Sequence, residues 1–253
     1  MSAPSSPEET GYGQNYQQSG SPVEGSSAAQ PCRMLVAPPP PTEGLVQCYV
    51  KRTKHFSSTL YELFLKEDET LLATVQKSSA EKCYAIRAAG VWGRGGAGAQ
   101  GRLLGKLKCD LWSSSEFKLV DGGANCKKLS VWDDERDELD VGEVQPRREL
   151  AKIKWASSDT GARSLQVSLG SGAPLVNKAP KWSEEKKRNV LDFEGRVTMG
   201  SCKNFQLAVE GSDQPVMQFG RVGKDAFNLD YAAPLNGLQA FGIALSVFGW
   251  RVV

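Results

Sequence analysis

The chain has 253 residues, of which 40% are hydrophobic and 24% charged, enough for one large domain with a sizeable buried core or for two small domains. Its 31 basic and 29 acidic side chains leave a net charge of only +2. That balance excludes a strong global field, so any anion site must come from local clustering of basic residues. No apolar run reaches the roughly 18–20 residues of a membrane-spanning helix. No secretory signal is visible at the amino terminus, and we expect an intracellular protein.

Residues 1–43 are dominated by Ser, Pro, Gly, Gln and Glu and end in a run of four prolines. A segment of this composition cannot bury enough apolar surface to offset the entropy lost on ordering. We therefore expect a disordered low-complexity tail over residues 1–43 and one folded domain over residues 44–253, with no second folded domain before residue 44. The tail could recruit a partner, but its composition does not identify one.

From Leu45 onward, short segments rich in β-branched, aromatic and Leu residues alternate with clusters of Gly, Asn, Asp or Ser, which is typical of strands joined by turns. About a dozen such strands with no helix between them predict a closed antiparallel sheet, because closure removes exposed edges. The segment 59–66 also fits a helical period, and we assign it as a strand. The expected strands are 45–52, 59–66, 70–76, 82–87, 103–109, 116–120, 148–155, 164–169, 189–199, 204–209, 216–222 and 226–230.

One segment, 235–248, does not follow this pattern of strands and turns. It follows Pro234, which suits the first turn of a helix, and it is apolar almost all the way round. A helix that is apolar on every side has to be surrounded by protein or lipid, and this one is too short to span a bilayer. We expect it inside the barrel as its core, with Gly237 and Gly242 leaving room for strand side chains. An amphipathic surface helix fits poorly, since no polar face exists.

Six motifs in the last third of the chain closely resemble the carboxy-terminal domain of Tubby-like proteins. They are NKAPKW (177–182), FEGRVT (193–198), CKNFQL (202–207), VMQFGRV (216–222), FNLDY (227–231) and residues 234–246. The match thins over 44–160 but stays traceable at GKLK (105–108) and FKLVD (117–121). The resemblance implies a mainly β fold, a closed twelve-stranded antiparallel barrel around a hydrophobic C-terminal α-helix. It also implies binding of phosphatidylinositol bisphosphates, especially the 4,5 isomer, at the cytoplasmic face of the plasma membrane.

The same resemblance places the headgroup contacts on a basic-x-basic pair, which here reads Lys106-Leu107-Lys108. Strand alternation points both ammonium groups to one face and Leu107 inward. Lys108 stands where the family usually has Arg; it keeps the charge but lacks the bidentate fork that matches a phosphate. The competing interpretation of the two lysines is an ordinary solvated strand face.

Two further positions complete the expected phosphoinositide site. A family Arg corresponds to Arg163. A family Asn that precedes a Tyr is replaced by Cys83, before Tyr84, and a thiol cannot make the hydrogen bonds of an amide. Arg87 lies four residues after Cys83, so alternation puts it on the same face, where it could compensate.

Other patterns suggest chemistry only weakly. GRGGAG (93–98) satisfies the dinucleotide fingerprint, but the Gly-rich residues after it cannot open the required helix, and we interpret it as a loop beside the lysine pair. His55 is the one histidine and lies in a turn, unsuited to a catalytic triad. The six cysteines form no C-x-x-C pair and are expected to be reduced thiols, mostly on strands. The acidic run 133–140 lacks EF-hand spacing and is expected to be a solvated loop. We therefore expect no catalytic residue, no metal site and no cofactor.

The sequence thus predicts a phosphoinositide-binding, membrane-tethered adaptor, not an enzyme, active in trafficking or signalling. Its expected partners are phosphatidylinositol bisphosphate in membranes and a protein cargo or trafficking complex, with the chain itself a monomer. We expect it at the cytoplasmic face of the plasma membrane and in the cytosol. The alternative is a transcription regulator that binds DNA in the nucleus after release, through the basic segment 178–188 or Arg147-Arg148. A ubiquitin-ligase adaptor, as in plant relatives with an F-box, is a third hypothesis.

Overall fold

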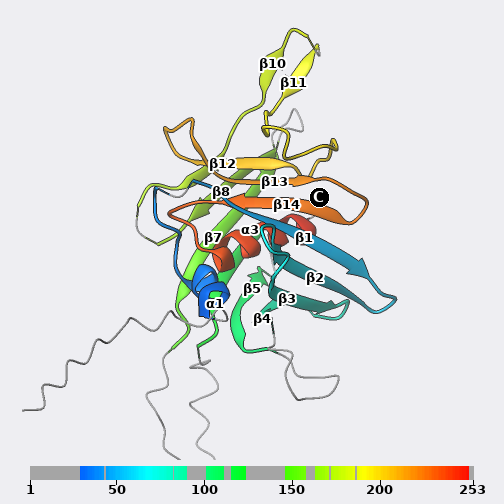
Figure 1. Cartoon of the computed structure of the whole chain (residues 1–253), viewed down its shortest axis with the longest axis vertical. Helices are drawn as coiled ribbons and strands as arrows, with labels where there is room; N and C mark the ends of the chain where they lie inside the picture. The colour runs from blue at the N-terminus through cyan, green and yellow to red at the C-terminus, as the bar shows by residue number, and fades with distance from the viewer. Residues whose placement is uncertain are drawn as a thin grey trace, which may run out of the picture.

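The computed structural model describes residues 29–42, 44–81, 83–89, 101–110, 115–123, 146–157, 163–170, 172–185 and 187–250. Twelve strands in this part of the chain close into an antiparallel barrel in the order β1-β14-β13-β12-β9-β8-β7-β6-β5-β4-β3-β2 (Figure 1), which confirms the predicted fold. The barrel strands are β1 (Val46–Lys54), β2 (Ser58–Leu65), β3 (Leu71–Ser78), β4 (Cys83–Ala88), β5 (Leu103–Cys109), β6 (Glu116–Asp121), β7 (Glu149–Ser157), β8 (Arg163–Ser168), β9 (Leu175–Asn177), β12 (Phe205–Val209), β13 (Pro215–Arg221) and β14 (Ala226–Tyr231).

Side chains alternate between the two faces of the barrel wall. On β7, Ala151, Ile153 and Trp155 are buried inside, while Lys152 and Lys154 are exposed on the outside. The period-2 pattern of the sequence therefore translates directly into an apolar interior and a polar exterior.

The helix α3 (Gly237–Gly249) runs through the middle of the barrel (Figure 1). Phe241 and Ile243 are fully buried there, and an added methyl group at Gly242 would lie 3.0 Å from the side chain of Leu119 on β6. The predictions of a central helix and of close packing at this glycine are confirmed. The helix begins two residues later than predicted because Asn236 caps it, accepting from the backbone N–H of Gln239. No helix in the described ranges is long and apolar enough to cross a bilayer.

The segment predicted as a strand over 189–199 is one only at its start. β11 (Arg188–Val190) pairs with β10 (Lys181–Ser183) in a hairpin that projects from the barrel (Figure 1). The chain then turns through positive φ angles at Glu194 (50°) and Gly195 (74°), so no strand can continue. The prediction is wrong beyond Val190, and the barrel is completed instead by the short β9, which was not predicted.

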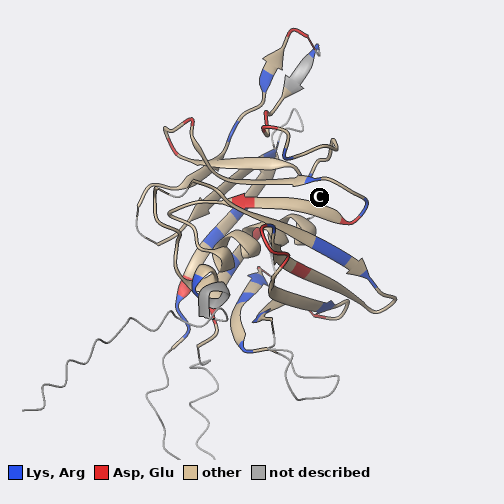
Figure 2. Cartoon of the chain, viewed as in Figure 1, with Lys and Arg blue, Asp and Glu red and all other residues tan. Residues whose placement is uncertain are grey.

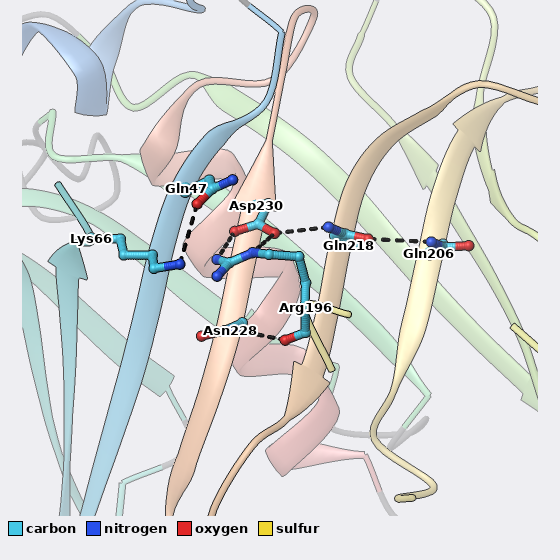
Figure 3. A network of polar contacts seen from close by, with 7 residues as sticks. All are labelled: Gln47, Lys66, Arg196, Gln206, Gln218, Asn228 and Asp230. Carbon is cyan, nitrogen blue, oxygen red and sulfur yellow. Dashed lines mark hydrogen bonds and ion pairs between the residues drawn. The ribbon is translucent and has the colours of Figure 1, made fainter. Parts of the chain in front are cut away.

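Residues 191–200 cross the outer face of β12 to β14 and are fixed there by a buried polar network (Figure 3). Arg196 donates to both carboxylate oxygens of Asp230, at 2.8 and 2.5 Å. Gln218 donates to the same carboxylate, and Gln206 donates to Gln218. This wall of the barrel is therefore covered by protein.

A short helix, α1 (Ala29–Val36), lies in the segment for which disorder was predicted. Leu35 is 1% exposed in the main core, and the Met34 carbonyl accepts a hydrogen bond from the Tyr231 hydroxyl. The prediction of disorder is wrong for these residues, because Leu35 packs in the core and the Met34 and Val36 carbonyls accept hydrogen bonds from Tyr231 and Asn236, next to the start of α3. Residues 1–28 lie outside the described part, and the domain boundary at residue 44 stays a prediction.

Candidate anion-binding site

Lys106 and Lys108 lie on the outer face of β5. Between them Leu107 is fully buried, while Lys106 is half-buried and Lys108 exposed. The inner face of β5 rests on the central helix, since an added methyl at Gly105 would lie 3.4 Å from Leu238. The two ammonium groups therefore project from a strand that the core holds rigidly.

Strand β4 places its candidate residues beside this pair. Cys83 is directly opposite Lys108, and Ala85 is opposite Lys106. Arg87 lies on the same outer face as Cys83, as the alternation predicted. Its guanidinium Nη1 donates to the Gly101 carbonyl at 3.2 Å, so one of its donors already has a partner within the protein.

Arg163 lies apart from the lysine pair. It begins β8, and β6 and β7 separate that strand from β5, a lateral distance of about 14 Å at roughly 4.8 Å per strand. Its guanidinium stacks 4.6 Å from the centre of the Trp250 ring and donates to the Cys202 carbonyl. Arg163 thus packs at the end of the barrel where α3 ends. The structure does not bring this residue beside Lys106 and Lys108.

Basic residues that the sequence analysis did not single out continue the site across the next two strands. Lys108 is directly opposite Lys118 on β6, and Lys118 is directly opposite Lys152 on β7. All three are exposed, and Figure 2 shows basic segments along β7. We call Lys108, Lys118 and Lys152 the lysine row. Their alternation with buried residues was visible in the sequence, but the pairing register that aligns them was not.

Two carboxylates lie beside the lysine row, and one of them pairs with a member of the row. Glu149 pairs with Lys152 at 3.4 Å, and Glu116 pairs with Lys154 at 3.3 Å. Within the described residues no ion pair involves Lys108 or Lys118. The outer face of β5 to β7 is therefore net positive.

Two cysteines of the barrel are unsuited to nucleophilic chemistry. Burial raises the pKa of Cys109, and the Asp110 carboxylate adds to the effect while Lys77 opposes it. In the core, burial together with the Asp230 carboxylate raises the pKa of Cys48 to about 12. Both groups are protonated at neutral pH, and the thiol form is a poor nucleophile.

The other sequence patterns fall partly inside and partly outside the described residues. His55 is exposed in the turn after β1. Among the described residues no three His, Cys, Asp or Glu side chains gather as a metal site requires. The segments 93–98 and 133–140 lie outside the described residues. A hollow of about 500 Å³ lined by Met34, Gln47, Lys66 and others lies between α1 and the start of the barrel, away from the lysine pair.

Comparison with known proteins decides the family. The model of the Tub family matches residues 36–172 and 165–250. The chain belongs to the Tub family. Tubby-related protein 2 of Mus musculus is 30% identical over an alignment 270 residues long, which covers 91% of this chain and 46% of that protein. Protein king tubby of Drosophila pseudoobscura pseudoobscura is 52% identical over 108 residues, covering 40% of this chain and 24% of its own length.

A plant relative of this Tub-family chain is similar over a shorter stretch. Tubby-like F-box protein 11 of Oryza sativa subsp. japonica is 39% identical over 109 residues, which cover 40% of this chain and 27% of the relative. The chain thus spans less than half the length of these curated relatives.

Proposed function

We propose that this Tub-family chain binds the headgroup of a phosphatidylinositol bisphosphate and acts as a membrane-tethered adaptor. The observation that carries the proposal is the placement of Lys106 and Lys108 on one outer face of β5, on either side of the fully buried Leu107. Preorganised donors lose little entropy when they capture an anion. The Tub family membership supports a binding module rather than an enzyme.

The energetics suit a reversible anchor. A basic side chain near an anionic leaflet contributes about 1 kcal/mol, and charge-assisted hydrogen bonds to phosphate add to that. Three or four converging charges with such bonds would give micromolar binding, about 8 kcal/mol. Arg87, on the neighbouring strand, is the nearest further candidate, whereas Arg163 would have to leave Trp250 and Cys202 to contribute.

We further propose that the membrane in question is the cytoplasmic face of the plasma membrane, and that the tethered chain presents a protein cargo or trafficking complex there. DNA binding after release is the second candidate, but the described geometry favours it less. In the segment 178–188, Lys178 donates to the Asp213 carbonyl and Lys187 pairs with Glu184, and Arg148 pairs with Asp121. A ubiquitin-ligase adaptor role is suggested only by the printed names of plant relatives such as the rice protein.

The test is co-sedimentation of the purified chain with phosphatidylcholine vesicles that carry phosphatidylinositol 4,5-bisphosphate. Lys106→Ala with Lys108→Ala should abolish binding, because it removes the paired charges. Lys66→Ala with Lys224→Ala is the matched control: both lysines are exposed turn residues next to β2 and β14, and the variant loses the same charge. Equal binding of both variants and the wild type would refute the site.

A parallel assay with duplex DNA at physiological salt separates the two candidate functions. Tight DNA binding that persists at that salt, without vesicle binding, would reverse their order, because non-specific phosphate contacts weaken steeply as salt rises.

The two candidate arginines are compared in single variants, Arg87→Ala and Arg163→Ala. We expect Arg87→Ala alone to weaken vesicle binding, since only Arg87 shares the face of the lysine pair.

A further inference from the structure

The lysine row carries an arrangement that a folded sheet ordinarily avoids. Lys108, Lys118 and Lys152 occupy directly opposed positions on three successive strands. Directly opposed side chains have Cβ atoms about 4.5–5.5 Å apart, and like charges at such positions destabilise the sheet. Lys152 has a partner in Glu149, at 3.4 Å, but Lys108 and Lys118 face each other without one among the described residues, and they repel each other in the free protein.

The adjacent row on the same wall shows the usual solution. Glu116 is directly opposite Lys154 and forms an ion pair with it, so that position places opposite charges across the strands. Gln166 is opposite Lys154 on the far side, and Ser168 is opposite Lys152. The self-repulsion is thus confined to one row, and neither Lys108 nor Lys118 has a described ion pair to relieve it.

We propose that the lysine row is a second, non-stereospecific contact that lays the wall of β5 to β7 flat on the acidic lipids of a bilayer. It rests on the proposed headgroup function in two ways: Lys108 belongs to both sites, and a headgroup bound there brings the bilayer to this wall. The row spans two strand intervals, about 10 Å, and its members are compact point charges on flexible stems rather than the forks that read one phosphate. Diffuse anionic charge spread over a plane, such as phosphatidylserine supplies, matches that arrangement.

Continuity with the proposed headgroup site favours a bilayer over a nucleic acid. A headgroup held at Lys106 and Lys108 brings the leaflet to the edge of the wall on which Lys118 and Lys152 stand. The row lies on a sheet face, whereas α1, the described helix outside the barrel, contacts Tyr231 and Asn236 and is not part of this wall, so the row has no recognition helix for a groove. The anionic leaflet would relieve the repulsion within the row, and the attraction is effective only within a Debye length, about 8 Å at physiological salt.

The experiment compares two kinds of vesicle at equal total charge. One is phosphatidylcholine with phosphatidylserine and no phosphoinositide, and the other is phosphatidylcholine with phosphatidylinositol 4,5-bisphosphate. Lys118→Ala with Lys152→Ala should weaken binding to the phosphatidylserine vesicles roughly 30-fold, from about 1 kcal/mol for each lysine. The salt dependence of that binding should become shallower, and binding to the phosphoinositide vesicles should fall by much less.

The controls keep the two proposals apart. Lys66→Ala with Lys224→Ala removes the same charge elsewhere and should leave both vesicles bound as by the wild type. If Lys118→Ala with Lys152→Ala changes neither vesicle, or weakens only the phosphoinositide vesicles, the second contact is overturned. If Lys118→Ala with Lys152→Ala instead loses duplex-DNA binding and keeps phosphatidylserine binding, the second contact is with nucleic acid and the membrane proposal is overturned. Failure of the headgroup proposal shows differently: the wild type would then not prefer phosphoinositide over phosphatidylserine.

Discussion

Two walls of the barrel place cations on their outer faces, and the chain uses them in opposite ways. On the wall of β12 to β14, Arg196 of the covering segment 191–200 pairs with Asp230 of β14, and their side chains are 13% and 1% exposed. On the wall of β5 to β7, the side chain of Lys152 is 61% exposed, and Lys108 and Lys118 are exposed as well. The first wall is sealed by its ion pair (Figure 3), while the second is open and net positive.

The contrast shows that a basic residue type says little by itself. Arg196 stands out in the motif FEGRVT, yet its guanidinium is already paired with the Asp230 carboxylate. Lys118 stands in an unremarkable alternation, yet the strand pairing places it between two other lysines. Burial and partners, rather than residue type, separate the structural cation from the available one.

The largest expected effect is on the sealed wall. Arg196→Ala leaves the Asp230 carboxylate buried without its cation, which costs about 3–5 kcal/mol of the free energy of unfolding. Urea denaturation followed by tryptophan fluorescence measures the loss. Arg148→Ala is the matched control, because Arg148 also pairs with an Asp but its side chain is 81% exposed; it should cost less than about 1 kcal/mol. If the two variants lost equal free energy of unfolding, burial would not make the Arg196–Asp230 pair more important for stability than an exposed ion pair.

The second prediction tests how tightly the segment 191–200 packs on the wall of β12 to β14. An added methyl at Gly220 would lie 2.6 Å from Cγ1 of Val197, so Gly220→Ala should push the segment 191–200 outward at a cost of about 1–3 kcal/mol. Trypsin cleavage after Arg196 should then accelerate. Gly200→Ala, in the same segment but with nothing within 4 Å of the added methyl, should leave cleavage unchanged. Slow cleavage in both variants would mean that the Val197 side chain accommodates the added methyl without a shift of the backbone of 191–200.

Most of the barrel could be predicted from the sequence, because period-2 burial and the long motifs of the last third are local signals. The errors share a physical cause: each involves a segment whose structure depends on a distant partner. Residues 191–200 are alternating and apolar enough to suggest a strand, but Arg196 binds β14 and the turn at Gly195 breaks the pattern. The helix α1 is short and Pro-flanked, and forms against Tyr231 and Asn236.

The candidate site was predictable only within one strand. Lys106 and Lys108 follow from alternation, whereas the lysine row requires the register between β5, β6 and β7. That register depends on how inner side chains such as Leu107 and Leu119 pack on α3, so no window of sequence contains it. The position of Arg163, three strands away and stacked on Trp250, was hidden for the same reason.

On the open wall, restoring a guanidinium should sharpen the headgroup contact. Lys108→Arg adds a bidentate fork where the chain has a point charge, and we expect about fivefold tighter binding to phosphoinositide vesicles, roughly 1 kcal/mol. Binding to phosphatidylserine vesicles should change little, because the charge is the same. A gain on both vesicles alike would indicate that Lys108 serves only the diffuse contact.

The smallest effect concerns the stability of the open wall itself. Lys118→Gln removes the middle charge of the row while keeping an exposed polar strand residue, so relief of the repulsion should raise the free energy of unfolding by about 0.5 kcal/mol. The gain should shrink as salt is added, since screening already weakens the repulsion between exposed charges. Lys154→Gln is the matched control on β7; it breaks the ion pair with Glu116 and should lower stability slightly or not at all. Destabilisation by Lys118→Gln would mean that the row is relieved within the protein, and the reason to expect an external anion there would be gone.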